Sequence, residues 1–167
     1  MDNLATLVIS RSDYSYLNAL ATDLYKLSKK HPETFLVMAK YCEYKKDPDR
    51  AFFFVEKALE LNPKYVNGWA FKGALLASAG RFSDAVKAFR VGMKWDNDVN
   101  MYFGLTQAYV MMDRLKEAMT IAQECLKMTN GNPKAHNMMA MVFTRYPQDH
   151  HNVRSIFFTL PMQIPLG

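Results

Sequence analysis

The sequence predicts an all-α chain in which helix–turn–helix repeats stack into a right-handed solenoid. The 167 residues include only 7 glycines and 7 prolines but 12 methionines, which suits helices better than a β-sandwich. The stretch "AFFFVEKALELNPKY" at 51–65 has the pattern of an amphipathic helix, and related stretches recur about every 34 residues. Composition, helical pattern and period therefore favour the same fold class.

The stretch 51–65 indicates that the repeat is helical. Three consecutive aromatics could begin a strand, but "EKALELNP" consists of strong helix formers that end in a helix-stop signal, Asn62-Pro63. On a helix, one apolar face carries Ala51, Val55, Ala58 and Leu59. The alanines on this face allow a second helix to approach closely, which predicts a helical hairpin. The aromatics are interpreted as core, with Phe52 and Phe53 as partial exceptions that face the convex side or a neighbouring subunit.

Equivalent residue types return in register along the chain. The second helix of each hairpin opens with Ala51, Ala85 and Ala118, and it closes with Ala58, Gly92 and Cys125. The first helix carries a bulky residue at Phe35, Trp69, Tyr102 and His136, and a small residue four positions later at Ala39, Gly73, Thr106 and Ala140. A repeat that buries its apolar face only by stacking on its neighbours explains this pattern.

The pattern of bulky, small and aromatic positions resembles the tetratricopeptide repeat (TPR). The clearest copy is 66–98, with Trp69, Gly73, Leu76, Gly80, Phe82, Ala85, Phe89 and Gly92. The resemblance implies a single TPR array over 1–167, with repeats at about 1–31 (clipped), 32–65, 66–98, 99–132 and 133–167 (degenerate, because Pro161 interrupts its second helix). About ten helices are expected. Because the tail "SIFFTLPMQIPLG" is apolar, the expectation is a segment of a longer superhelix or a truncated form of one.

The composition and the motifs make several classes of function unexpected. The net charge of +5 is spread along the chain, so no nucleic-acid surface is predicted. No apolar run approaches 18 residues, so no membrane span is expected. The two cysteines, Cys42 and Cys125, occupy repeat core positions and favour a reducing compartment. The pair His150-His151 lacks a third ligand at helical spacing, and no phosphate loop or catalytic constellation occurs. The sequence therefore predicts no enzyme, cofactor, metal or small-molecule substrate.

The TPR resemblance implies a concave surface, lined by the first helix of each repeat, that holds peptides or protein subunits. In this register the expected groove residues are Lys40, Tyr44, Asn67, Phe71, Asn100, Phe103, Gln107, Asn137, Met138 and Met141. An asparagine amide there can bond both N–H and C=O of an extended peptide. One TPR subclass grips chaperone C-termini with a Lys/Asn clamp, and the sequence departs from it. Lys40 is the one basic candidate, while Phe71 and Gly104 stand where the clamp needs polar residues.

A closer resemblance is to the TPR subunits of the anaphase-promoting complex (cyclosome), a cell-cycle ubiquitin ligase. It rests on "KGALLASAGRFSDAVKAFRVGMKW", on "YFGLTQAYVMMDRLKEAMTIAQECLKMTNGNPKAHNMMAMVF" and on "HPET" with "ALELNPKY". It implies a non-catalytic scaffold in the nucleus and cytoplasm. The implied partners are cyclosome TPR subunits and a second copy of the chain. The alternative from another class is a free-standing peptide-binding adaptor or co-chaperone.

Overall fold

The computed structural model describes residues 19, 23, 30–130 and 132–145. This part of the chain contains helices and no strand. The helices are α3 (Pro32–Tyr44), α4 (Pro48–Leu61), α5 (Val66–Ser78), α6 (Phe82–Met93), α7 (Val99–Met111), α8 (Leu115–Met128) and α9 (Pro133–Thr144). The predicted all-α class is confirmed. The stretch 51–61 is helical throughout, and α4 ends directly before Asn62-Pro63.

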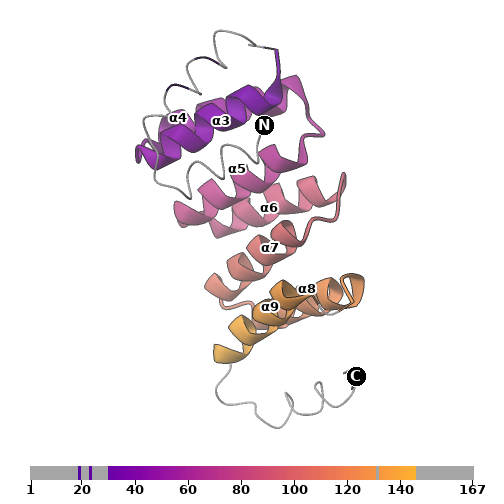
Figure 1. Ribbon diagram of the computed structural model, residues 1–167. Helices are drawn as coiled ribbons and strands as arrows, with labels where there is room; N and C mark the ends of the chain where they lie inside the picture. The colour runs from indigo at the N-terminus through magenta and orange to yellow at the C-terminus, as the bar shows by residue number, and fades with distance from the viewer. Residues whose placement is uncertain (1–18, 20–22, 24–29, 131, 146–167) are drawn as a thin grey trace.

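The helices pair as antiparallel hairpins, and each hairpin stacks on the next one along the chain (Figure 1). The hairpins are α3 with α4, α5 with α6, and α7 with α8, and α9 packs on both α7 and α8. The first helices also meet across hairpins, because α5 contacts α3 and α7. The three hairpins fall within the predicted ranges 32–65, 66–98 and 99–132. Most of the predicted first repeat, and the second helix of the last, lie outside the described residues.

Local sequence signals explain where the helices begin. Proline occupies the first turn of α3, α4 and α9, where its missing N–H costs no hydrogen bond. The side chains of Asp47, Asp98 and Asn132 cap α4, α7 and α9 by accepting hydrogen bonds from backbone N–H groups of the first turn. These caps satisfy donors that have no partner within the helix.

The turn inside each hairpin is the same Schellman motif. Lys46, Gly80 and Asp113 have positive φ angles of 56°, 74° and 58°, at equivalent repeat positions. In each turn the following N–H bonds back to a carbonyl five residues earlier: Asp47 to Cys42, Arg81 to Leu76, and Arg114 to Tyr109. The repeat therefore requires a left-handed residue here, and only Gly80 adopts that conformation without strain.

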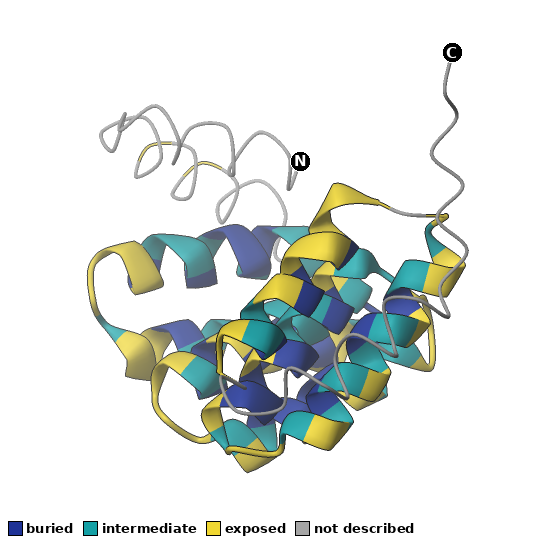
Figure 2. Cartoon of the chain, turned by 90° about the horizontal axis from the view of Figure 1, so that it is seen from below, coloured by how far each residue is buried: buried dark blue, intermediate teal, exposed yellow. Residues whose placement is uncertain are grey.

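Buried side chains gather between the helices and leave the outer faces of the hairpins exposed (Figure 2). Ala51, Ala85 and Ala118 are each 0% exposed, as the hairpin crossing requires. Phe53 is 55% exposed, in line with its expected outward position. Ala140 differs from its equivalents Ala39, Gly73 and Thr106, since it is exposed. Among the described helices, α9 packs mainly on α7 and α8, and no described helix follows α9 to cover Ala140.

Candidate functional site: a groove between the first helices

A groove of about 650 Å³ opens between α5 and α7. Its walls come from both helices, and the α5–α6 hairpin closes one side. The lining residues are Ala70, Ala74, Ala77, Ser78, Gly80, Phe82, Phe89, Asn100, Phe103, Gly104, Gln107, Ala108 and Met111. Small side chains on α5 leave the space, and the longer side chains of α7 border it. The predicted concave surface thus includes a real depression in the described part of the chain.

Phe89 of α6 lines this groove because two glycines let it reach between the first helices. A Cβ at Gly73 would lie 2.5 Å from the Phe89 ring, and a Cβ at Gly104 would also clash with it. Phe89 is 3% exposed and belongs to the main core cluster. Groove and core are therefore built on the same ring.

Three predicted groove residues line this depression together: Asn100, Phe103 and Gln107. They lie on one face of α7, at helical spacings of three and four residues. Asn100 and Gln107 are exposed, and Phe103 is half-buried. The structure therefore brings one aromatic ring and two amides to a shared surface.

Six other predicted groove residues lie on the first helices of the remaining repeats, α3, α5 and α9. Tyr44 is 38% exposed at the end of α3, and Lys40 is half-buried one turn earlier. Asn67 is exposed near the start of α5, whereas Phe71 packs against the core cluster of α3 and α4. On α9, Asn137 is exposed and Met141 packs against the core beside Val142. None of these six residues lines the α5–α7 groove.

The expectation that Met138 faces the groove is wrong. Met138 is 0% exposed and lies in a cluster with Tyr102, Cys125 and Ala135. It occupies the repeat position of Phe71 and Gly104, and in α9 its side chain packs into the core. A long apolar side chain at this position gains more by filling the core than by lining the surface.

Lys134 is a groove-edge residue that the sequence reasoning missed. Its ammonium group contacts the side-chain oxygen of Asn100 and lies 5.5 Å from the centroid of the Phe103 ring. The Asn100 amide nitrogen donates to both carboxylate oxygens of Asp98, at 3.0 and 3.1 Å. The repeat pattern indicates this position, because Lys134 follows Asn67 and Asn100 at the repeat spacing. A ligand of Asn100 would have to share or displace these bonds.

The groove walls carry little charge. Helix α7 has no charged residue, and the one charge on α5, Lys72, forms a 2.6 Å ion pair with Glu56 of α4. The arrangement suits an uncharged segment that offers apolar side chains to Phe103 and backbone groups to the amides. It offers no cluster of cations for a terminal carboxylate.

Other candidate chemistry is limited in the described residues. In this part of the chain no three His, Cys, Asp or Glu side chains are grouped to hold a metal ion; His150-His151 lie outside it. Cys42 and Cys125 are 7% and 0% exposed, and burial raises the pKa of both thiols. Both cysteines therefore serve as small core residues, as the sequence predicted. Within the same ranges, none of the helices has the length and apolar character needed to cross a membrane.

Comparison with known proteins agrees with this geometry. The tetratricopeptide-repeat family model matches residues 32–65, the α3–α4 hairpin with its following turn. The described helices form a tetratricopeptide-repeat superhelix. The TPR array of the solved "APC/C hetero-tetramer Cut9-Hcn1" superposes with a TM-score of 0.78 at 15% identity, covering 85% of this chain and 28% of that one.

The TPR chain is homologous to subunit 7 of the anaphase-promoting complex. It is 31% identical to that subunit of Arabidopsis thaliana over 142 residues, which cover 85% of this chain and 25% of the relative. It is 27% identical to that of Homo sapiens over 138 residues, covering 82% and 24%. The chain thus spans about a quarter of the length of the curated relatives it matches.

Proposed function

We propose that the chain is a non-catalytic scaffold segment of an anaphase-promoting complex, acting through protein–protein contacts. The observation that carries the proposal is the 31% identity to subunit 7 across 85% of the chain. The matched length covers several repeats, so the similarity is not confined to one hairpin. The proposed partners are other TPR subunits of the complex and a second copy of this chain.

The groove between α5 and α7 supports a role in binding protein segments. Its apolar walls and the Asn100 and Gln107 amides match an extended, uncharged segment better than a charged ligand. No nucleic acid, membrane or small-molecule substrate is part of the proposal. Catalysis is not part of it either, because nothing in the groove pairs a nucleophile with a base.

The adaptor or co-chaperone alternative has weaker support from the same groove. A clamp for a terminal carboxylate needs basic and amide side chains on consecutive repeats. Here Ala70, Ala74 and Gly104 line the groove, and Phe71 packs against a core cluster instead of lining it. The scaffold function therefore fits the groove better.

The proposal extends to cellular location in the nucleus and cytoplasm, where such a ligase would act. The two reduced cysteines are compatible with these compartments. Imaging of the tagged full-length protein through the cell cycle would test this part. Exclusion from both compartments would contradict it.

Affinity purification with mass spectrometry tests the function. The tagged chain should recover anaphase-promoting complex subunits, and the double variant Asn100→Ala/Gln107→Ala should recover less if the groove takes part. A matched control, Asn97→Ala/Gln123→Ala, removes the same two amide types outside the groove. Recovery of heat-shock chaperones without complex subunits would favour the adaptor. If the groove variant recovers the subunits as well as the parent does, the contact lies on another surface of the chain.

A further inference from the structure

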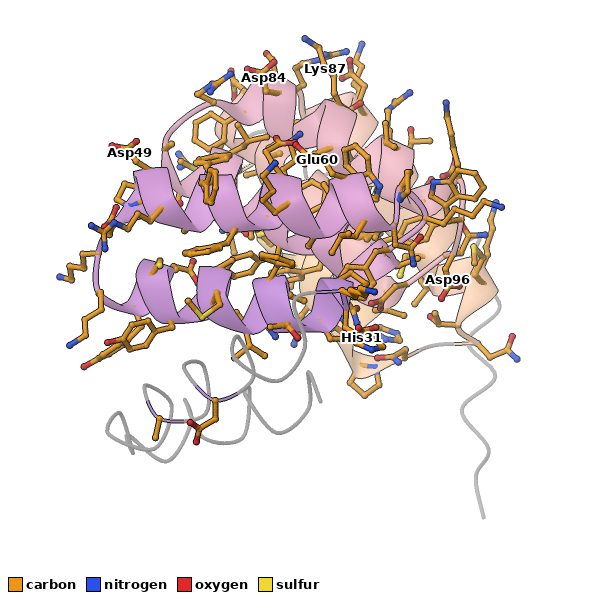
Figure 3. All side chains as sticks on the ribbon, turned by 90° about the horizontal axis from the view of Figure 1, so that it is seen from above. His31, Asp49, Glu60, Asp84, Lys87 and Asp96 are labelled. Carbon is orange, nitrogen blue, oxygen red and sulfur yellow. The ribbon has the colours of Figure 1, made fainter. Side chains whose placement is uncertain are left out.

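A second cleft lies between α6 and the turn that joins α7 to α8. It has a volume of about 360 Å³ and is lined by Ser83, Val86, Lys87, Arg90, Tyr109, Met112 and Arg114. Three of the seven lining residues are cations and none is an acid. Lys87 lies beside Asp84 at the surface of α6 (Figure 3).

The polar groups of this cleft are organised around Tyr109. The Arg90 guanidinium donates a 2.8 Å hydrogen bond to the Tyr109 hydroxyl, and the Arg114 guanidinium lies 5.1 Å from the centroid of the Tyr109 ring. Tyr109 is 2% exposed, so its ring is a fixed platform between the two arginines. A guanidinium carries five N–H donors, so the bond to Tyr109 leaves most of the Arg90 donors available.

Arg90 differs from its neighbours in how its charge is balanced. Lys87 pairs with Asp84 at 3.1 Å, and Arg114 pairs with Glu117 at 2.6 Å. Among the described residues, no carboxylate forms an ion pair with Arg90. An exposed guanidinium held in place by a buried tyrosine is thus the focus of excess positive charge in the cleft.

The repeat itself provides a comparison. The equivalent positions one hairpin earlier hold Asp49, Phe53, Glu56 and Leu76 in place of Ser83, Lys87, Arg90 and Tyr109. There the Glu56 carboxylate pairs with Lys72 of the next helix. The fold therefore does not require cations or a tyrosine at these positions. The cationic cleft between α6 and the α7–α8 turn thus has no counterpart in the preceding hairpin.

We propose that this cleft binds a phosphorylated serine or threonine side chain of a protein partner. A phosphate monoester carries between one and two negative charges near neutral pH and three acceptor oxygens, which suit a lining that holds Arg90, Arg114 and Lys87. The Tyr109 hydroxyl accepts from Arg90 and thereby holds the guanidinium in position at the cleft. The Ser83 hydroxyl lies on the same lining.

The charge pattern favours one phosphate over a polyanion. A nucleic-acid strand needs cations along a track, whereas the equivalent surface of the preceding repeat carries Asp49 and Glu56. An aspartate-rich segment offers the same kind of oxyanion with one charge and two oxygens. It is expected to bind more weakly than the phosphorylated segment.

Fluorescence anisotropy with the whole chain tests the proposal. The probes are fluorescein-labelled Gly-Ala-Gly-Xaa-Gly-Ala-Gly peptides with phosphoserine, serine or aspartate at Xaa, and a labelled 12-nucleotide single-stranded DNA. The phosphoserine peptide should bind at least about tenfold more tightly than the serine peptide, and inorganic phosphate should compete with it. Arg90→Glu should weaken binding by about tenfold or more, and Tyr109→Phe by about threefold.

The matched control is Lys127→Glu, which makes the same charge change on α8 outside the cleft and should alter affinity less than about twofold. Arg90→Glu introduces the residue type already present at position 56, and Arg90→Ala is the second variant if melting shows that the first is unfolded. Equal binding of phosphoserine and serine peptides would overturn the proposal. Equal losses in Arg90→Glu and Lys127→Glu would do so too, as would tighter binding of the DNA. These outcomes do not depend on which complex the chain joins.

Discussion

The Phe89 ring lies directly against Gly73, so that a Cβ added at Gly73 would lie 2.5 Å from the ring edge. Gly104 flanks the same ring from α7, where a Cβ would clash as well. The ring is therefore in close contact with both α5 and α7. Two glycines inside helices normally destabilise them, and here they allow three helices to share one aromatic side chain.

Gly73→Ala should destabilise the fold although alanine is the better helix former. The propensity gain is about 1 kcal/mol, while overpacking against a buried ring typically costs about 1–3 kcal/mol. Urea unfolding should show a net loss of stability for Gly73→Ala and for Gly104→Ala. Combining Gly73→Ala with Phe89→Leu should destabilise less than the sum of the single changes. Additive effects would show that the ring is not the obstacle.

Ala51→Leu and Ala85→Leu should each lower the free energy of unfolding by about 1–3 kcal/mol, because both alanines are 0% exposed at hairpin crossings. In a linear array the damage should reach the adjacent repeat and then fade, which hydrogen exchange would reveal. Ala140→Leu is the matched control, since Ala140 is exposed on α9. Equal melting temperatures for Ala85→Leu and the parent would refute the crossing.

The left-handed turn positions should respond to glycine in opposite directions. Gly80→Ala forces a Cβ into a φ of 74° and should cost about 1 kcal/mol. Lys46→Gly relieves the same strain and should stabilise the fold by up to about 1 kcal/mol, and Asp113→Gly should do so by less, because aspartate tolerates this conformation better. Ala79→Gly, at a φ of −80° in the α5–α6 turn, should destabilise. Thermal unfolding of the four variants gives the comparison.

Groove variants should separate binding from stability. Asn67→Ala and Asn100→Ala change exposed side chains, so the free energy of unfolding should stay within about 0.5 kcal/mol of the parent. Partner capture should fall with Asn100→Ala, which lies in the groove, more than with Asn67→Ala, which lies outside it. Met138→Ala should instead destabilise by about 2–5 kcal/mol, because it opens a cavity in the core. Calorimetry would give the stability of each variant, and capture assays on the same preparations would give its partner binding.

The buried thiols should make stability depend on alkaline pH. Burial raises the pKa of Cys125 above its ordinary value of 9.0, so the folded state holds the proton more tightly than the unfolded state. The resulting stability is complete below pH 9 and is lost as the pH rises through the folded pKa. Cys125→Ala should therefore flatten the loss above pH 9, as measured by urea unfolding. In the native parent, thiol reagents at pH 7 should label Cys125 more slowly than Cys42, and both slowly compared with the urea-unfolded chain.

The sequence by itself determined the repeat and the helices that compose it. Stacked helical hairpins need a small residue where two helices cross, so Ala51, Ala85 and Ala118 recur at a fixed spacing in the sequence. All three are buried in the structure. Asn100, Phe103 and Gln107 of α7 could be assigned to one face from the sequence for the same reason, because that assignment needs only the 3.6-residue period of the helix. Position within a helix is local information.

Contacts between helices were decided only by the tertiary structure. Met138 shares a repeat position with Gly104 and Phe71, yet its burial depends on the space that α7 and α8 leave beside α9. Lys134 joins the groove because it reaches Asn100 from the next repeat, and Arg90 meets Tyr109 across 19 residues of sequence. A period predicts which positions are equivalent. Which side chains meet across neighbouring helices depends on their lengths and charges, and these vary from one repeat to the next.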